Sequence, residues 1–351
     1  MTPPPTDADA DADADETAQA GNGRAETAAD APDDLAATAA LLRREHPDAD
    51  RFEDTTFLHW LYRENPHHPA IEEDVDRKGA RVAHFALVPQ PWRNREEQAT
   101  FVLSVNAVTR SGLGSMHFVA LTARATKRAI ERKEELGGLI GGIGVTNENS
   151  TMPGLHRIGA RLITSLPVVA IPRLGGGRRV ESHAVTDGFR ASADFARLTA
   201  GLDEAPADGW TQRWTPEQLA WRLAAPGAGY AVHADDSVVA VTTRATAKGV
   251  PLAVVLKLLP RGPAPGPRSA RKVIAAAMRH HRVPMAIYAG FNVHVPVKGI
   301  AIPKGVQPAP LNLLFIARDE ASAFLGMDLE DAGPQAPATF DTFELLDFDA
   351  F

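Results

Sequence analysis

The sequence predicts a mixed α/β protein made of two similar units behind an acidic tail. Predicted strands and helices alternate along both halves of the 351-residue chain. Residues 219–226 repeat the pattern of 58–66, and Trp60 and Trp221 stand at matching places in the two segments. A duplicated unit of roughly 150 residues explains both the length and the layout. Chance similarity between two mixed domains is the alternative.

Residues 1–35 carry a net charge of −9, with ten carboxylates and one base, Arg24. The remainder has 36 bases and 34 acids, a net charge of +2, which gives −7 for the whole chain. Because the Asp-Ala run at 7–15 lacks aromatic and branched apolar residues, we expect a disordered tail, with a partner-binding segment as the alternative. The nearly neutral remainder lacks the basic excess of a nucleic-acid binder, so no DNA partner is expected.

The chain has no cysteine, which excludes disulfides, Fe–S clusters, thiolate zinc sites and cysteine nucleophiles. The histidine pairs 67–68 and 280–281 lack the spacing of metal ligands, so no metal is expected. No apolar run of about 18 residues and no secretory signal is present. We therefore expect a cytoplasmic protein without a membrane partner.

In the first half, an aromatic amphipathic helix precedes a series of strands. The helix ends near Asn65 and Pro66, and a turn of small residues at 109–115 separates the second strand from a long helix. The predicted helices are 35–44, 57–62, 115–135 and 155–158, and the predicted strands are 80–88, 99–108, 139–145 and 162–171.

The second half follows a connector at 172–215 that is rich in Gly, Arg, Asp and Ala and includes a helix. Residues 290–292 resemble 145–147, as expected for a repeat. The predicted strands are 230–234, 238–243, 251–259 and 285–289, with a helix at 270–280.

The turn at 109–115 has the pattern of a phosphate-binding site. A helix N-terminus attracts anions, and Gly112 and Gly114 let a phosphate approach the backbone. Arg110 can add a charge-assisted contact. A Walker motif is absent, and His117 replaces the third glycine of a dinucleotide-binding motif. A tight strand-to-helix turn without a ligand is the alternative.

Three segments in this order resemble the GNAT family of acyl-CoA-dependent N-acyltransferases, and in particular its tandem group with mycothiol synthase and the enhanced-intracellular-survival proteins. They are the W-L-Y-R-E-N-P helix at 60–66, the T-R-S-G-L-G turn at 109–114, and V-T-N-E-N-S at 145–150 with H-R-I-G at 156–159. The resemblance implies two tandem units, each with a central mixed, mostly antiparallel sheet flanked by helices.

The implied boundaries are a tail at 1–35, an acyl-CoA-binding unit at 36–172, a connector at 173–215 and a degenerate second unit at 216–351. Three prolines at 260–265 remove backbone donors from the equivalent turn of the second unit. That unit is therefore expected to shape the acceptor cleft and to bind no acyl-CoA.

The resemblance implies an acyl-CoA co-substrate, with acetyl-CoA first among the candidates. The expected cofactor contacts are Ala107, Val108, Arg110, Ser111, Gly112, Leu113, Gly114, Ser115, Asn147 and Ser150. The basic run 124–133 is read as a solvated helix face, with a contact to the 3′-phosphate of CoA as the alternative.

The expected catalytic residues are Asn106, Ser150, His156 and the chain end at Phe351. Leu155 stands where many family members have the tyrosine that protonates the leaving thiolate, so Ser150 or His156 is expected to replace it. For these residues the alternatives are a strand polar side chain, a helix cap, a surface histidine and a docking tail.

The predicted reaction is direct transfer of an acyl group to an amine of a small molecule or peptide. One alternative keeps the fold and takes the acyl group from an aminoacyl-tRNA; the nearly neutral charge argues against it. The other alternative is a GNAT-like binding protein without turnover. The acceptor and the oligomeric state are left open by the sequence.

Overall fold

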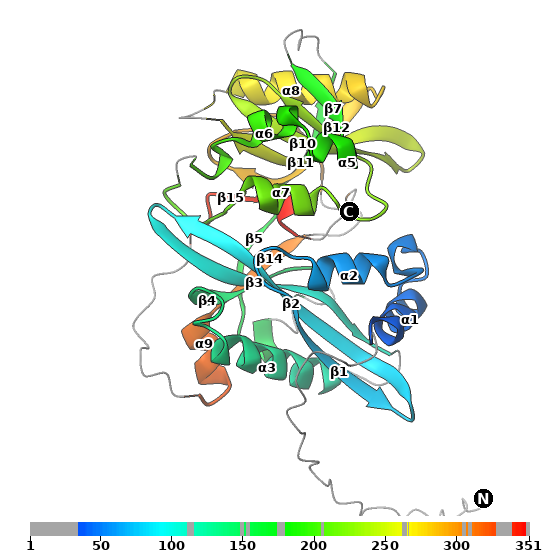
Figure 1. Cartoon of the computed structure of the whole chain (residues 1–351), viewed down its shortest axis with the longest axis vertical. Coiled ribbons are helices and arrows are strands. Elements are labelled where there is room, and N and C mark those ends of the chain that lie inside the picture. Colours follow the sequence, from blue (N-terminus) through cyan, green and yellow to red (C-terminus); the bar gives the residue numbers. More distant parts are fainter. Residues whose placement is uncertain are drawn as a thin grey trace, which may run out of the picture. The chain divides into compact units, whose positions relative to one another are not determined.

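The computed structural model describes residues 34–110, 116–147, 151, 155–173, 180–204, 207–261, 265, 267–303, 307, 311–327 and 339–348. Residues 1–33 of the expected tail lie outside the described residues. The helices and strands all belong to one compact unit, Leu35–Phe351. Figure 1 shows its two sheets, with α3 on the first and α8 on the second.

The first sheet has the order β1-β2-β3-β4-β14-β5, with the short β8 beside β2. All neighbours are antiparallel except β3 and β4, which α3 connects. The strands are β1 Ile71–Arg77, β2 Ala80–Asn94, β3 Glu97–Thr109, β4 Leu139–Thr146, β5 Arg161–Ser165, β8 Thr211–Gln212 and β14 Asn312–Ala317.

The strand β2 runs past the proline at which we expected it to end. Pro89 and Pro91 stay paired with β3, whereas β1 pairs with β2 only as far as Leu87. The missing proline N–H groups therefore fall where β2 has lost one neighbour, which is where a strand tolerates proline. β1 itself, with the sequence IEEDVDR, lacks apolar alternation and was not predicted.

Helices cover both faces of the first sheet. Alternate side chains such as Phe85 and Val102 pack against α3 (Met116–Glu131). Ala86 and Leu103 face the other way, toward α1 (Leu35–Glu45) and α2 (Thr56–Arg63). The single-turn helix η1 (Asp50–Phe52) lies between these two helices, and α9 (Arg318–Phe324) follows β14.

The second sheet repeats this arrangement with the order β7-β9-β10-β11-β12-β6-β13. Its one parallel pair, β11 and β12, is connected by α8 (Pro267–His280), as α3 connects β3 and β4. The strands are β6 Val168–Pro172, β7 Glu181–Ala184, β9 Tyr230–Ala234, β10 Val238–Ala247, β11 Val250–Pro260, β12 Met285–Asn292 and β13 Ile300–Ala301. The segment expected as a connector holds β7, α5 (Asp187–Arg190), α6 (Ala193–Thr199), η2 (Leu202–Glu204) and β8.

The two sheets exchange a strand. β6 leaves the first half and pairs with β12, while β14 leaves the second half and pairs with β4. The single strand expected at 162–171 is therefore wrong: it is broken at Leu166 and Pro167 into β5 and β6, which belong to different sheets. The sheets do not follow a boundary at residue 172, and the division into units given above stays a prediction.

Trp60 of α2 and Trp221 of α7 (Pro216–Arg222) join the two halves reciprocally. Each indole N–H donates to the backbone carbonyl of the other tryptophan, at 3.0 and 3.2 Å, and the rings stack with centroids 5.0 Å apart. Trp60 belongs to an apolar core that takes side chains from both sheets, and the partly buried Trp221 packs against this core. Matching positions of the repeated segments thus make matching contacts.

Candidate active site

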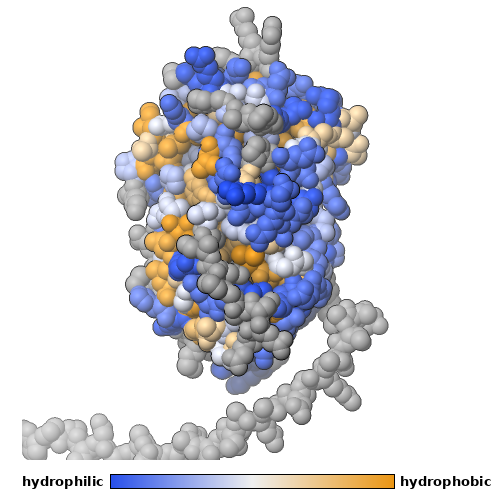
Figure 2. All heavy atoms as spheres, turned by 90° about the vertical axis from the view of Figure 1, so that its left-hand side faces the viewer, coloured by the Kyte–Doolittle hydropathy of each residue, from blue (hydrophilic) through white to orange (hydrophobic). Residues whose placement is uncertain are grey.

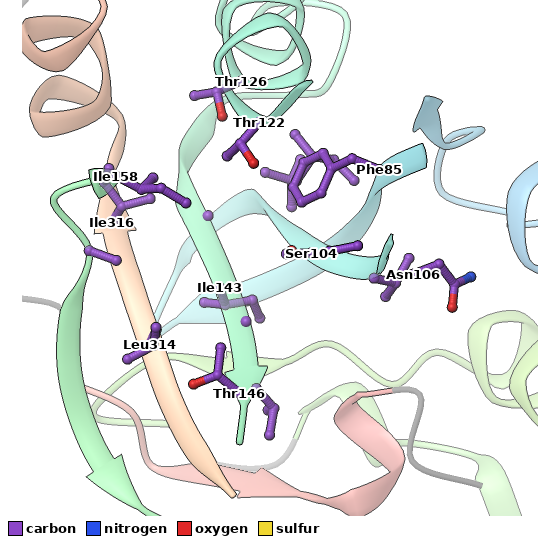
Figure 3. A pocket seen from close by; sticks show the side chains of 18 of the residues that line it. Phe85, Ser104, Asn106, Thr122, Thr126, Ile143, Thr146, Ile158, Leu314 and Ile316 are labelled. Atoms are coloured by element: carbon purple, nitrogen blue, oxygen red, sulfur yellow. The ribbon is translucent and has the colours of Figure 1, made fainter. Parts of the chain in front are cut away.

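The parallel strands β3 and β4 separate at one end and open a cavity. Their pairing runs from Thr100 with Leu139 to Ser104 with Gly144, whereas β3 continues to Thr109 and β4 to Thr146. A cavity of about 800 Å³ lies at this divergence, lined by β3, β4, α3, β14 and the segment around η1. Figure 3 shows Ser104 and Asn106 on one side of it and Ile143 and Thr146 on the other. Within the described chain, no strand replaces β4 beside β3 past Ser104, so backbone groups there can bond to a ligand.

Asn106 marks the point where β3 turns away from β4. Its φ is +49°, in the left-handed region that asparagine tolerates better than most residues. The register between β2 and β3 shifts at the same place, between His84 and Ala86. This bulge re-aims the strand at the cavity, a common device beside active sites.

A chain of buried hydrogen bonds holds the Asn106 side chain. Its Nδ2 donates to the Tyr62 hydroxyl (2.7 Å), which lies 2.9 Å from His84 Nε2, and His84 Nδ1 lies 2.7 Å from Asp74 Oδ1. A carboxylate can only accept, so His84 donates to Asp74 from Nδ1. In the tautomer without a proton on Nε2, the ring accepts there from the Tyr62 hydroxyl, which in turn accepts from Asn106.

The outer end of this chain is anchored by an arginine. Arg81 Nη1 lies 3.3 Å from Asp74 Oδ2 and donates to the Thr38 hydroxyl of α1 at 2.6 Å. The Arg81 side chain is buried and the Asp74 side chain is about a quarter exposed. The position of Asn106 therefore depends on α1, α2, β1 and β2 together.

The expected cofactor residues divide into three groups. Ala107 and Arg110 line the cavity, as does Asn106, which was expected to be catalytic, whereas Val108 is buried and pairs with His84. Asn147 follows the end of β4 and accepts hydrogen bonds at its carbonyl from the backbone and hydroxyl of Thr151. Ser111, Gly112, Leu113, Gly114, Ser115 and Ser150 lie outside the described residues.

Of the other expected catalytic residues, His156 is exposed and does not line the cavity, although Ile158 and Ala160 do. Phe351 lies outside the described residues. Sequence reasoning missed Tyr62 and Asp74. Tyr62 is one apolar-face residue of an amphipathic helix and Asp74 one of several acids in β1, so no spacing signals their contact through His84.

The basic run on α3 is partly neutralised. Arg124 and Arg128 both bind the Glu73 carboxylate of β1, at 2.8 and 2.6 Å. Lys127 lies 3.8 Å from Glu131 on the exposed side of the helix. These contacts agree with a solvated helix face that also clamps β1.

In the second sheet the parallel strands β11 and β12 separate at the equivalent place, but another segment of the chain fills the space between them. β11 and β12 pair from Ala253 with Ala286 to Val255 with Tyr288, and β15 (Thr342–Glu344) then pairs with β12 at residues 290–292. The following turn η4 (Leu345–Asp347) packs on β11. Gln90 and Arg222 also hold this segment by bonds to its carbonyls.

Lys257 of β11 lies at the centre of this filled divergence. Its Nζ is 2.7 Å from Asp347 Oδ2 and 3.0 Å from Glu344 Oε2, and all three side chains are within 1% of full burial. Burial lowers the pKa of Lys257, but the two carboxylates outweigh it and the net shift is upward. Burial, together with Asp347, raises the pKa of Glu344 to about 7 against the opposing effect of Lys257.

The described residues contain no cluster of three or more His, Asp or Glu side chains placed to bind a metal ion. No helix among them is long and apolar enough to cross a membrane. Figure 2 shows hydrophobic surface in separate groups with hydrophilic side chains between them on the face in view.

The arrangement of both sheets matches solved structures of acyltransferases. A probable N-acyltransferase from Enterococcus faecalis V583 aligns with a TM-score of 0.54 at 10% identity, covering 84% of this chain and 72% of its own. A GCN5-related N-acetyltransferase (GNAT) from Kribbella flavida aligns at 0.52 and 15% identity, covering 83% and 70%. One from Anabaena variabilis ATCC 29413 aligns at 0.51 and 10%, covering 81% and 70%.

The chain has the GNAT fold. The predicted fold class, with two mixed sheets flanked by helices, is thereby confirmed. No protein-family model matches the sequence, and no curated protein matches it. At these identities the likeness establishes the fold, and the activity has to be argued from the site.

Proposed function

We propose that this chain is an acyl-CoA-dependent N-acyltransferase that transfers the acyl group directly to an amine of a small molecule or peptide. The observation that carries the proposal is the open divergence of β3 and β4, with its bulge at Asn106 and its cavity of about 800 Å³. A pantetheine arm has amide groups that can bond to the free edges of two separated strands. The GNAT fold of the chain supports the same reading.

The donor would enter between the strands, with its pyrophosphate at the N-terminus of α3. Arg110, at the end of β3, lines the cavity on this side and is exposed. A helix N-terminus and an arginine together suit a pyrophosphate. Ala107 and the glycines of the 109–115 turn are our proposed backbone contacts.

The reaction needs few side chains. A neutral amine nitrogen attacks the thioester carbonyl carbon, the new C–N bond forms as the C–S bond breaks, and the nitrogen's proton ends on the thiolate as CoA-SH. Backbone N–H groups of β3 at the bulge would stabilise the oxyanion. The buried chain from Asp74 to Asn106 would keep that bulge in place, which makes Tyr62 and His84 positioning residues.

The acceptor would reach the thioester from the η1 side. His46, Ala49, Arg51 and Phe52 line this end of the cavity. The second unit, whose own divergence is filled by residues 342–348, would serve as a tandem partner without a donor site. This extends the predicted division into a donor-binding and a degenerate unit.

Thermal unfolding with added ligands tests the proposal. A ligand that binds only the native state raises the melting temperature. We expect CoA and acyl-CoA to raise it, and NAD and ATP to leave it unchanged. A rise followed by acceptor-dependent thiol release across a panel of amines supports transfer. No rise with any CoA species contradicts the donor site, and binding without thiol release supports a binding protein.

A further inference from the structure

The positive charge of the chain is concentrated in one stretch of the sequence. Residues 237–317 contain 11 Lys and Arg and no Asp or Glu. The rest of the chain from residue 36 onward has 25 bases and 34 acids. The nearly neutral total, which argues against a nucleic-acid binder, is therefore the sum of a basic part and an acidic part. A partner responds to the charge of the surface that it touches, and the total does not report that charge.

This stretch builds the second sheet's outer layer. It includes β10, β11, α8 and β12. Ala240 and Val255 pack with α8, whereas Val239 and Val254 face the core shared with the first sheet. Figure 1 shows α8 on the side of the second sheet that faces away from the first. None of the described residues that line the cavity comes from α8, so a ligand of this layer is independent of the proposed acyl-transfer site.

Every exposed side chain that the structure describes on α8 is basic. Between residues 268 and 280, Arg268, Arg271, Lys272 and His280 are exposed, Arg279 is half-buried, and all the others are buried. Because the apolar residues pack on the sheet, the helix presents only basic groups to solvent. Within the described part of the chain, no carboxylate pairs with Arg268, Arg271 or Lys272.

Two further arginines extend this surface past the C-terminal end of α8. Arg282 follows the helix and is exposed. The Thr242 hydroxyl of β10 lies 2.9 Å from His281 Nε2, and the exposed Arg244 comes two residues further along the same face of β10. The surface that we call the α8 face consists of Arg244, Arg268, Arg271, Lys272 and Arg282.

The equivalent helix of the first sheet carries bases of a different kind. On α3, Arg124 and Arg128 share the Glu73 carboxylate, and Lys127 lies 3.8 Å from Glu131. These bases have partners within the folded chain. On α8, bases three and four residues apart face one another without an acid between them, which destabilises a helix. The fold itself therefore makes no use of the charge on the α8 face.

We propose that the α8 face binds the phosphate backbone of a nucleic-acid duplex, without regard to its sequence. The helix advances about 18 Å from Arg268 to His280, and over that length each strand of a duplex presents about five phosphates. Four of the five residues of the face are arginines, whose planar forks match phosphate oxygens. The spacing and the chemistry of the face thus suit this polyanion.

Three properties favour a duplex over other polyanions. A helix that binds a bilayer inserts apolar side chains, and the described apolar side chains of α8 are all buried in the protein. Single-stranded nucleic acid is held by exposed aromatic rings, and α8 has no Phe, Tyr or Trp. The surface of a folded acidic protein carries charges of both signs, whereas every unit of a nucleic acid is an anion.

Fluorescence anisotropy of the full chain with labelled DNA and RNA duplexes of about 20 bp and arbitrary sequence tests the inference. We expect dissociation constants of about 1–100 μM at physiological salt. For five phosphate contacts on DNA, the logarithm of the binding constant should fall with the logarithm of the KCl concentration with a slope of about −4.5. No binding of either duplex at about 50 mM KCl overturns the inference. Tighter binding to phosphatidylserine vesicles or to poly-glutamate than to both duplexes also overturns it.

Substitutions on α8 place the contact. Arg268→Gln, Arg271→Gln and Lys272→Gln in one chain remove three of the five contacts. We expect this triple variant to bind DNA at least about tenfold more weakly and to reduce the steepness of the salt dependence by about 2.7.

The matched control removes the same charge from the first sheet. Lys127→Gln, Arg132→Gln and Lys133→Gln change three bases at the end of α3 that each lie within 4 Å of a glutamate. This control should keep both the affinity and the slope. Equal losses in the two triple variants show an effect of net charge and overturn the placement on α8.

If the triple variant of α8 has a lower melting temperature, Lys272→Gln and Lys127→Gln give the same comparison with one exposed lysine each. The slope should become shallower by about 1 in the first and stay unchanged in the second. Equal slopes in these two variants overturn the inference. Failure of CoA species to bind contradicts the proposed function alone, because α8 does not line the cavity.

Discussion

The first sheet leaves the divergence of its parallel strands open, and the second sheet fills it. In the first, β3 and β4 separate around a cavity lined in part by α3. In the second, β11 and β12 also separate after a short parallel pairing, and residues 342–348 occupy the space between them. Two sheets of the same arrangement thus differ in what lies between two strands: within the described residues, the first has a cavity there and the second holds residues 342–348.

The difference is also chemical. Asn106 and Lys257 each lie just beyond the last parallel pair of their strand. Asn106 is neutral and held from behind by Tyr62, whereas Lys257 is a buried cation with two carboxylates. A charge buried in the second divergence requires a permanent partner, and the segment 342–348 provides it.

The largest expected effect is on stability. It follows from removing Lys257, the cation buried where residues 342–348 fill the space between β11 and β12. Lys257→Met leaves Glu344 and Asp347 buried without a counter-charge, which should cost about 3–5 kcal/mol of unfolding free energy. Denaturant unfolding measures it. Adding Glu344→Gln and Asp347→Asn to Lys257→Met should recover most of the loss, and a triple variant as unstable as the single one contradicts this account.

The next effect concerns the open divergence. Gly144→Val should lower the affinity for CoA species about 100-fold, equivalent to about 2.7 kcal/mol, because its side chain fills the space beside Ser104. Its melting temperature should not fall, since valine suits a strand interior better than glycine. Calorimetric titration and thermal unfolding measure the two quantities, and retained affinity in a folded variant refutes a ligand between these strands.

A smaller effect is expected from the support behind Asn106. Tyr62→Phe removes the hydroxyl that links Asn106 to His84, and should lower kcat about tenfold while leaving the donor KM unchanged. His233→Gln is the control, since His233 is buried and hydrogen-bonded in the second sheet, away from the cavity. It should reduce stability without changing kcat. Equal losses of kcat in both variants indicate a general loss of structure.

A further expected effect, separate from these substitutions, is a pH dependence of stability. The pKa of Glu344 is raised by burial from 4.5 to about 7, so the folded state holds a proton that the unfolded state releases. Stability from this group is full below pH 4.5 and is lost as the pH rises to about 7. Unfolding of Glu344→Gln across this range should show a flatter pH profile than the unmodified chain. Parallel profiles contradict the assignment.

Two buried histidines, His233 of β9 and His281 just after α8, act in the opposite direction. Burial lowers the pKa of His233 to about 3 and that of His281 to about 4, from 6.5. Their contribution to stability is full above pH 6.5 and is lost as the pH falls toward these values. Both the Glu344→Gln variant and the unmodified chain keep these histidines. The difference between their pH profiles therefore reports the contribution of Glu344 alone.

Local patterns were enough to predict the elements around the cavity. Alternating apolar residues indicated β3 and β4, helical spacing indicated α2, α3 and α8, and the matching tryptophans indicated the repeat. Asn106, Ala107 and Arg110 were predicted as site residues from their position at the end of the strand before the glycine turn, and all three line the cavity. These features depend on neighbours in the chain, which a sequence displays directly.

The tertiary structure decided which strand pairs with which. The exchange of β6 and β14 depends on a break in the strand at Leu166 and Pro167. No local sequence pattern indicates that the chain crosses to the other sheet there. Gly141 shows the same limit, because the backbone that requires it, at Ile316, is far along the chain.

The sequence by itself thus determined the alternation of elements, the repeat and the strand that leads to the site. Only the tertiary structure decided that one divergence is open and the other is filled, and that Asp74 reaches Asn106 through His84 and Tyr62. The physical reason is the range of the interactions. Periodicity records which face of an element is buried, whereas pairing and buried polar contacts join residues whose separation along the chain carries no signal.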